Sequence, residues 1–282
     1  MSPPTPSMPS RRALLLGLAS WPLACGPSHP PRQPPGNHPL DDRVHGKKRT
    51  SILVIPEGLT VAAPLLIALH DSGQSPQAMQ QEAGWAAMCA KRGWLGLFPR
   101  FEKPGPQDDN VYLATVLARA LAVGGGDRRR VYVVGHGAGG RRAYALGSTH
   151  SGLLAGLAAV GGVVRFATND LGHQDPDGPA LSVLHWHGAT DAVVPAQGGE
   201  VVSGDGKTRQ VAAVDKALAP WVAEFQGAEA PLTPSLPAPL QVRRWAGGGH
   251  EVVRVIDPAG THAWPAAATE VMADFFARCP AR

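Results

Sequence analysis

Two side chains in the second half of the sequence have the types and the setting needed for acid–base chemistry. Asp191 follows the apolar segment 181–188 and His262 follows the apolar segment 251–257, so each is predicted just beyond the end of a strand. A carboxylate that orients a histidine, and a histidine that accepts a proton, are two of the parts that make a serine hydroxyl nucleophilic. The third part, the nucleophile, often precedes both on a sharp turn from a strand into a helix.

The turn with this character lacks its nucleophile. Residues 131–146 read as a strand followed by a helix, and the junction has the sequence Gly-His-Gly-Ala-Gly at 135–139. In the pattern G-x-S-x-G serine occupies the centre, where this chain has Gly137. The central residue of such a turn is strained by roughly 1–3 kcal/mol unless it is glycine, which adopts the conformation freely. We therefore predict a nucleophile turn without its nucleophile, in a site that keeps its acid and base.

The elements that must position these residues alternate between strands and helices. Segment 64–70 is apolar throughout, as expected of a strand covered on both faces. Such alternation predicts an α/β fold with a doubly wound, mostly parallel sheet and helices on both faces. Residues 163–180 are irregular and are predicted to form a rim or lid. The predicted strands are 50–56, 64–70, 94–99, 130–135, 154–162, 181–188, 240–246 and 251–257; helices are predicted at 75–93, 108–123, after the turn, and at 208–225 and 265–279.

Four stretches together resemble the secreted polyhydroxybutyrate depolymerase and feruloyl esterase-like family of α/β-hydrolases. They are ALHDSGQS, DRRRVYVVGHGAGG, LHWHGATDAVVP and RRWAGGGHEVVRVIDPAGTHAWP, and they span the chain from about residue 47 to its end. The resemblance implies an α/β-hydrolase fold acting on polyester, feruloyl or similar short acyl esters. It implies that Asp191 is the acid, His262 the base and Gly137 the vacant serine position. It also implies oxyanion-hole N–H groups from Ser72 and Ala138.

A second departure from the family lies in the loop after segment 64–70. Asp71 stands where the family typically has glycine. A carboxylate beside the oxyanion hole would oppose the negative charge that develops there during acyl transfer. We interpret the two departures, Asp71 and Gly137, as a sign that selection for acyl-enzyme chemistry has been relaxed or redirected. His136 and Trp264 are predicted to line the same pocket.

Two functions remain open at this point. The first is a pseudoenzyme with weak or no ester hydrolysis that binds an ester, a glycan or a polymer. The second is an active but atypical esterase or depolymerase, in which His262 activates water or a relocated hydroxyl group replaces the missing serine. The hydroxyl groups near the turn belong to Ser72, Ser75, Ser148 and Thr149.

Other histidines are interpreted without a metal or a cofactor. His185 and His187 alternate on one face of a strand and mimic a metal site with Asp191, but no further ligand motif accompanies them. His250 follows three glycines and competes with His262 for the role of the base. We choose His262 because it follows the last strand and carries the family's HAWP context.

The N-terminal region predicts export. In residues 1–25, two arginines precede the apolar run 13–19, which is too short to span a bilayer. Leu-Ala-Cys at 23–25 resembles a lipobox, although Pro22 is unusual there, so lipidation of Cys25 and a plain cleaved signal both remain open. We predict a proline-rich tether at 26–46 and the hydrolase domain at 47–282, in the extracellular space or the periplasm.

Charge and cysteine content limit the classes of partner. The net charge is +4, and removal of the two N-terminal arginines leaves 4 − 2 = +2, too little to indicate a nucleic-acid partner. If Cys25 is lipidated, Cys89 and Cys279 remain as a pair in an oxidising compartment. The family's fold places their helices on one face of the sheet, which implies a disulfide; two buried free thiols are the alternative. The sequence leaves the oligomeric state open.

Overall fold

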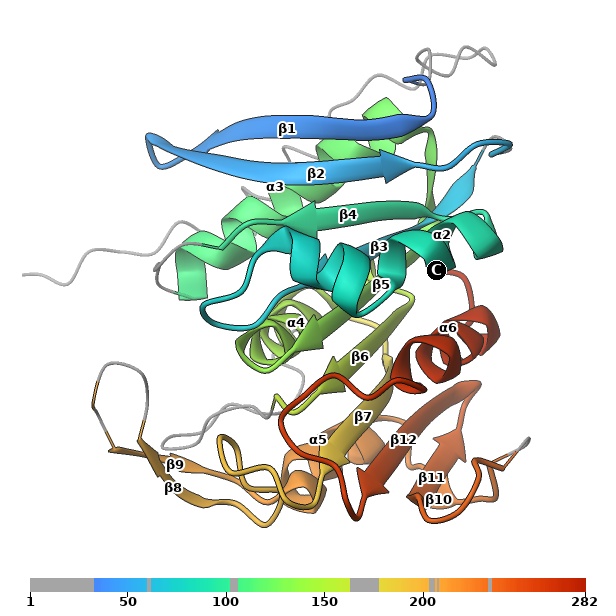
Figure 1. Ribbon diagram of the computed structural model, residues 1–282. Coiled ribbons are helices and arrows are strands. Elements are labelled where there is room, and N and C mark those ends of the chain that lie inside the picture. The colour runs from blue at the N-terminus through green and yellow to red at the C-terminus, as the bar shows by residue number, and fades with distance from the viewer. Residues whose placement is uncertain are drawn as a thin grey trace, which may run out of the picture. The chain divides into compact units, whose positions relative to one another are not determined.

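The predicted sheet is confirmed in the computed structural model, which describes residues 33–59, 62–101, 106–162, 178–202, 206, 208–232 and 235–282 (Figure 1). Six central strands pair in parallel, and antiparallel strands extend the sheet at both edges. A separate hairpin joins β8 (Gly199–Val202) to β9 (Thr208–Val211). The sheet order is β1 (Gly36–Val44), β2 (Lys47–Ile55), β4 (Leu95–Pro99), β3 (Ala63–Leu69), β5 (Gly126–His136), β6 (Gly156–Val160), β7 (Ser182–Gly188), β12 (His250–Asp257), β11 (Gln241–Gly247) and β10 (Ala228–Glu229).

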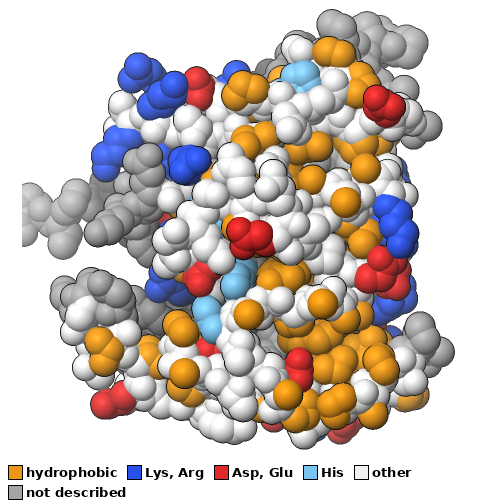
Figure 2. All heavy atoms as spheres, viewed as in Figure 1, with side chains coloured by type: hydrophobic (Ala, Val, Ile, Leu, Met, Phe, Trp, Pro, Cys, Tyr) orange, Lys and Arg blue, Asp and Glu red, His pale blue; other side chains and the backbone are white. Residues whose placement is uncertain are grey.

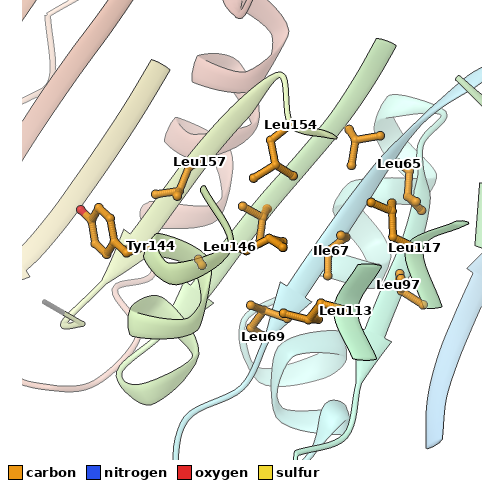
Figure 3. Close-up of a cluster of buried hydrophobic side chains, with 14 of the residues drawn as sticks. Leu65, Ile67, Leu69, Leu97, Leu113, Leu117, Tyr144, Leu146, Leu154 and Leu157 are labelled. Atoms are coloured by element: carbon orange, nitrogen blue, oxygen red, sulfur yellow. The ribbon is translucent and has the colours of Figure 1, made fainter. Parts of the chain in front are cut away.

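Helices cover both faces of the sheet, which explains why the central strand β3 is apolar throughout. One hydrophobic cluster joins the sheet to α3 (Pro106–Gly124), α4 (Ala138–Thr149) and α5 (Val214–Glu224); the other joins it to η1 (Ala78–Glu82), α2 (Trp85–Arg92) and α6 (Ala268–Arg278). In β3, Leu65, Ile67 and Leu69 face the first cluster, shown in Figure 3, whereas Leu66 and Ala68 face the second. A short 3₁₀ turn, η2 (Ser151–Leu153), follows α4.

Two predicted helices differ from the observed ones. The helix expected at 75–93 is divided into η1 and α2 by Gly84, whose φ of 71° lies in the left-handed region. The segment expected to be helical at 208–225 begins as strand β9, because residues 208–211 pair with β8, and α5 follows only at Val214.

The predicted tether is wrong for residues 36–46. Strand β1 pairs with β2 over its full length, from Gly36 opposite Ile55 to Val44 opposite Lys47. Leu40, Asp42 and Val44 of β1 are buried. The alternation is not apparent in the sequence because the central residue of the three is Asp42, which forms an ion pair with Arg119. The hydrolase domain therefore begins before residue 47. The remainder of the predicted tether and the predicted export signal lie outside the described residues. Within the described part of the chain, no helix has both the length and the apolar character that crossing a bilayer requires.

The predicted disulfide between Cys89 and Cys279 is also wrong, because both residues are buried free thiols. The two helices share a face of the sheet, as expected, but their sulfurs pack over different strands. Cys89 lies over Gly96 of β4 and Cys279 over Gly156 of β6. In the sheet β4 and β6 are separated by β3 and β5, which corresponds to about 14 Å at the usual strand spacing. A disulfide needs Cα atoms closer than about 7 Å.

Thiol counting tests this arrangement. Burial raises the pKa of both thiols, so neither should react quickly in the folded protein. In a Cys25→Ser chain unfolded without reductant, a thiol reagent is expected to label both Cys89 and Cys279. Labelling that appears only after reduction would contradict the structure.

Candidate functional site

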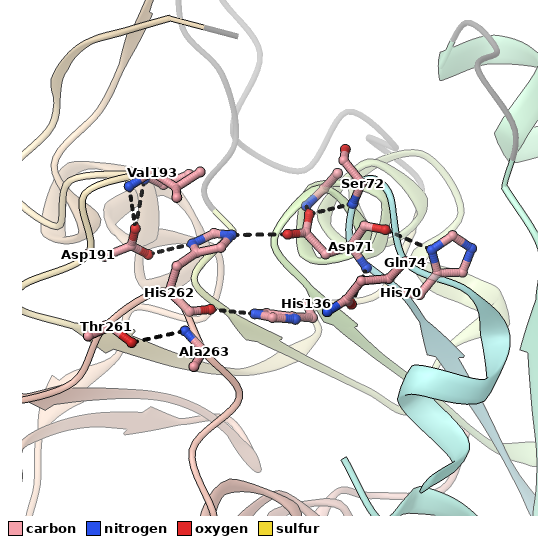
Figure 4. A network of polar contacts seen from close by, with 12 residues as sticks. His70, Asp71, Ser72, Gln74, His136, Asp191, Val193, Thr261, His262 and Ala263 are labelled. Atoms are coloured by element: carbon pink, nitrogen blue, oxygen red, sulfur yellow. Dashed lines mark hydrogen bonds and ion pairs between the residues drawn. The ribbon is translucent and has the colours of Figure 1, made fainter. Parts of the chain in front are cut away.

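The carboxyl ends of four parallel strands bring the predicted site residues together (Figure 4). Asp71 follows β3, Gly137 follows β5, Asp191 follows β7, and His262 lies five residues beyond β12. Adjacent parallel strands end at the same edge, where open α/β sheets form their ligand sites. Residues as far apart in sequence as 71 and 262 therefore meet in one cluster.

The turn at Gly137 has the strained backbone that the sequence predicts. Gly137 lies at the N-terminus of α4 with φ 49° and ψ −113°. Helix and strand approach closely around it, because a Cβ on Gly135 would overlap the backbone of Gly139, and a Cβ on Gly139 would overlap the carbonyl of Leu69. The glycines on both sides thus permit the tight turn, and the central position keeps the geometry that a nucleophile would need.

Asp191 and His262 form a closely hydrogen-bonded pair. Nδ1–H of His262 donates to Oδ2 of Asp191 at 2.7 Å, and the N–H groups of Val193 and Val194 donate to Oδ1 at 2.9 and 2.8 Å. Burial alone would raise the pKa of Asp191, but the hydrogen bonds from His187, His262 and the backbone hold it far below the usual range. Asp191 is therefore an ionised carboxylate that fixes the orientation of the His262 ring.

The carboxylate of Asp71 lies where a serine side chain would lie. A Cβ on Gly137 would overlap the carboxyl carbon and Oδ1 of Asp71 and would be 2.6 Å from Oδ2. Backbone N–H groups of Ser72 and Ala138, the predicted oxyanion donors, both donate to Oδ1 of Asp71 at 2.7 Å. Nε2–H of His262 donates to Oδ2 at 3.1 Å. One side chain thus occupies both the position predicted for the nucleophile and the position predicted for the oxyanion (Figure 4).

His262 is consequently held between two carboxylates. Burial alone would lower its pKa, but the hydrogen bonds to Asp191 and Asp71 outweigh burial and raise the pKa of His262 to about 9. For Asp71 burial alone would raise the pKa, but the hydrogen bonds from His262 and the two backbone N–H groups bring the pKa below its ordinary value. At neutral pH the pair is an imidazolium and a carboxylate. In this state His262 has no free lone pair with which to act as a base.

His136 and Trp264 support the cluster from one side. Nε2–H of His136 donates to the carbonyl oxygen of His262 at 2.6 Å, and the two imidazole rings stack with centroids 5.2 Å apart. The Trp264 ring meets His136 edge-on at 5.8 Å, and its Nε1–H donates to Oγ1 of Thr269 at 3.0 Å. Burial lowers the pKa of His136, which favours its neutral form. His136 therefore lies against the loop that carries both His262 and Trp264.

The same cluster contains the ligand atoms most suited to a metal ion among the described residues. Atoms of Asp71, His136 and His262 lie within 4.8 Å of one another. The rings of the two histidines are stacked, whereas metal ligands converge on a common point. Hydrogen bonding, with both Asp71 oxygens already accepting N–H groups, accounts for the arrangement without an ion.

A buried chain of hydrogen bonds behind Asp191 is a part of the site that the sequence did not predict. The carbonyl of Val194 accepts a hydrogen bond from Nε2–H of His187 at 2.7 Å, which leaves Nδ1 of His187 to accept from Nε2–H of His185 at 2.9 Å. Nδ1 of His185 then accepts from the hydroxyl of Tyr144 at 2.8 Å. Nε2 of His187 also lies 3.4 Å from Oδ2 of Asp191. In the sequence, the alternation of His185 and His187 was the feature from which this network could have been predicted. The hydrogen bonds show that the two histidines position Asp191 and do not form a metal site.

The loop that carries Asp71 is fixed by a second histidine. Nδ1–H of His70 donates to the carbonyl oxygen of Asp71 at 2.7 Å, and Nε2 of His70 accepts from the N–H of Phe101 at 3.1 Å. Oε1 of Gln74 accepts from the N–H of Asp71 at 3.2 Å. These contacts hold the backbone on both sides of the carboxylate in place.

The remaining sequence candidates lie away from the vacant position or outside the described residues. The hydroxyls of Ser148 and Thr149 donate to the carbonyl oxygen of Ala145 within α4. His250 begins β12, at the opposite end of the strand from the site. Most of the predicted lid, residues 163–177, is outside the described residues.

The cluster is open to solvent at one side. The side chains of His262 and Asp71 are each 17% exposed, whereas Asp191 is enclosed. In Figure 2, histidine atoms (pale blue) reach the surface beside acidic atoms (red) near the middle of the drawn face. A small ligand can therefore approach the Asp71–His262 contact from solvent.

Comparison with known proteins agrees with this architecture. No family model matches the chain. Poly(3-hydroxyalkanoate) depolymerase C of Paucimonas lemoignei is 25% identical over 189 residues, which are 52% of this chain and 45% of the relative, so the match spans less than half of that protein. An acetyl xylan esterase from Aspergillus awamori superposes with a TM-score of 0.63 at 11% identity, over 86% of this chain and 100% of the esterase. A putative dienelactone hydrolase from Klebsiella pneumoniae superposes with a TM-score of 0.54 at 17% identity, over 86% of this chain and 98% of the hydrolase. The chain therefore has the α/β-hydrolase fold and is similar to esterases and to a poly(3-hydroxyalkanoate) depolymerase.

Proposed function

We propose that this chain is an exported α/β-hydrolase-fold protein that has lost serine-dependent ester hydrolysis and uses its site to bind an ester, a glycan or a polymer. The observation that carries the proposal is the carboxylate of Asp71, which lies at the serine position and accepts both oxyanion-hole hydrogen bonds. A substrate ester has neither a serine to attack it nor free N–H groups for its carbonyl oxygen.

The protonation state of His262 supports the same proposal. A general base needs an unprotonated nitrogen at the operating pH, and hydrogen bonds to Asp191 and Asp71 raise the pKa of His262 to about 9. Activation of water by His262, the alternative kept from the sequence, therefore needs displacement of Asp71 first. Of the candidate hydroxyls, those of Ser148 and Thr149 receive no support, since they donate to the carbonyl oxygen of Ala145 within α4.

Similarity and the N-terminal sequence support the proposed class of ligand and the proposed location. Similarity to a poly(3-hydroxyalkanoate) depolymerase favours a polyester or a related short acyl ester as the ligand. The export signal predicted at 1–25 favours an extracellular or periplasmic location, and acylation of Cys25 would anchor the protein to a membrane.

Ester hydrolysis assays test the loss of activity. Purified protein and a His262→Ala variant are compared on p-nitrophenyl butyrate and ethyl ferulate. We expect the two proteins to give the same background rate, because no acyl-enzyme can form in either. Turnover by the natural sequence that disappears in His262→Ala would overturn the proposal.

A further inference from the structure

We propose that Asp71 is itself a nucleophile, which attacks a saturated carbon of an alkyl electrophile, specifically an epoxide, and forms an ester on its own side chain. The inference goes beyond the proposed function, which assigns no reaction to the site. It rests on the positions of Asp71, His262 and the two backbone N–H groups.

The oxyanion hole indicates which carbonyl carbon the site is built to attack. In acyl transfer to a serine, the hole holds an oxygen of the substrate. Here the N–H groups of Ser72 and Ala138 hold Oδ1 of Asp71, each at 2.7 Å. If Asp71 were esterified through Oδ2, attack of water on its Cγ would place the negative charge on Oδ1. The donors are therefore arranged for hydrolysis of an Asp71 ester.

The other oxygen, Oδ2, is the attacking atom. Asp71 is an ionised carboxylate that is partly exposed, and carboxylates of this kind serve as covalent nucleophiles. Attack on an acyl ester would leave the substrate's own carbonyl oxygen without donors, since the hole is full. Attack on a saturated carbon needs no such donors. The occupied hole thus favours an alkyl over an acyl electrophile.

His262 supplies the proton that an epoxide needs. Its Nε2–H lies 3.1 Å from Oδ2, beside the atom that attacks. An electron pair of Oδ2 forms the new C–O bond, the ring C–O bond breaks, and the ring oxygen takes its electrons and the proton from His262. A leaving group that departs as a stable anion would not use this proton. The protonated imidazole therefore selects an epoxide among alkyl electrophiles.

The second half of the reaction uses the same residues in reversed roles. Neutral His262, oriented by Asp191, now takes a proton from water while the water oxygen attacks Cγ of Asp71. The intermediate collapses with cleavage of the Cγ–Oδ2 bond. The departing alkoxide takes the proton of the new carboxyl group, which restores the carboxylate and leaves His262 protonated. The sum is an epoxide plus water giving a vicinal diol, with one oxygen of water left in Asp71.

Oxygen labelling tests this sequence directly. The full-length protein is incubated with phenyl glycidyl ether in H₂¹⁸O, and the peptide containing Asp71 is analysed by mass spectrometry. We expect ¹⁸O in the Asp71 carboxylate and release of the diol. Asp71→Asn should abolish both, whereas Asp41→Asn, an exposed aspartate paired with Lys48 at the surface, should behave as the natural sequence.

A His262→Gln variant separates the two halves of the reaction. The glutamine amide can still donate to the epoxide oxygen but cannot take a proton from water, so a covalent adduct should accumulate on Asp71 and diol release should fall by about 10²-fold or more. Thermal unfolding of each variant establishes that it is folded. Absence of both label and adduct, or an adduct on another side chain, would overturn the inference and leave Asp71 as a plug of the oxyanion hole. Esterase activity in the assays above would refute the proposed function but not this inference. Those assays measure cleavage of an acyl ester, whereas ¹⁸O in the Asp71 carboxylate reports hydrolysis of an ester formed on Asp71 itself.

Discussion

Replacing Gly137 by serine alone is expected to give no esterase activity, whereas Asp71→Gly combined with Gly137→Ser is expected to create it. The single variant puts a Cβ and a hydroxyl into space filled by the Asp71 carboxylate, and the oxyanion donors stay engaged. Removing that carboxylate frees the donors of Ser72 and Ala138 and leaves the Asp191–His262 pair next to the new serine. Each oxyanion donor contributes about 10²–10³ in rate, so the double variant should exceed the single variant by at least about 10²-fold on p-nitrophenyl butyrate.

Controls assign the gain to the restored serine. Asp71→Gly alone frees the hole without a nucleophile and should remain close to background. Addition of His262→Ala to the double variant should remove the gained activity. Gly137→Ser alone should also lower the thermal midpoint, because the serine must adopt a positive φ and displace Asp71. A single variant as active as the double one would mean that Asp71 does not occupy the hole in solution.

The sequence predicted the elements of the site better than it predicted their contacts. Apolar runs such as Leu65–Leu69, buried on both faces, identified parallel strands, and the order of Gly137, Asp191 and His262 along the chain located the three positions at strand ends. Both signals are local, since each depends on residue types within one segment. The structure agrees with them because adjacent parallel strands carry their following loops to one edge.

Contacts between residues far apart in the sequence could not be predicted, because they depend on the direction in which each side chain points in the folded protein. Asp71 was predicted to lie beside the oxyanion hole, whereas its carboxylate accepts the hydrogen bonds of the predicted hole, because the missing side chain at Gly137 leaves room for it. The helices of Cys89 and Cys279 were placed on one face, but the distance between the strands beneath them was not visible in the sequence. Strand β1 was not predicted because Asp42, which pairs with Arg119, lies between the buried apolar residues Leu40 and Val44.

Stability is expected to fall as the pH rises from 6.5 to about 9, and this dependence should become smaller in Asp71→Asn, in which Asp191 still holds the pKa of His262 above its ordinary value. The folded pKa of His262, about 9, lies above its ordinary value of 6.5. A raised pKa contributes stability that is complete below the ordinary value and is lost as the pH rises through the folded value. Moving one group from 6.5 to about 9 corresponds to about 3 kcal/mol of unfolding free energy.

The acid side of the profile has the opposite sign. Asp71 has a folded pKa below its ordinary value of 3.8, so its contribution is present above that pH and is lost as the pH falls further. The difference in unfolding free energy between the natural sequence and Asp71→Asn should therefore be largest between pH 3.8 and 6.5, and should shrink on both sides. Denaturant unfolding across this range, with NMR titration of His262, measures it. Asp41→Asn serves as the control, because an exposed ion pair should change stability by less than about 1 kcal/mol. A difference that does not vary with pH would show that Asp71 is not paired with a protonated His262, and it would remove the acid that opening of an epoxide by Asp71 requires.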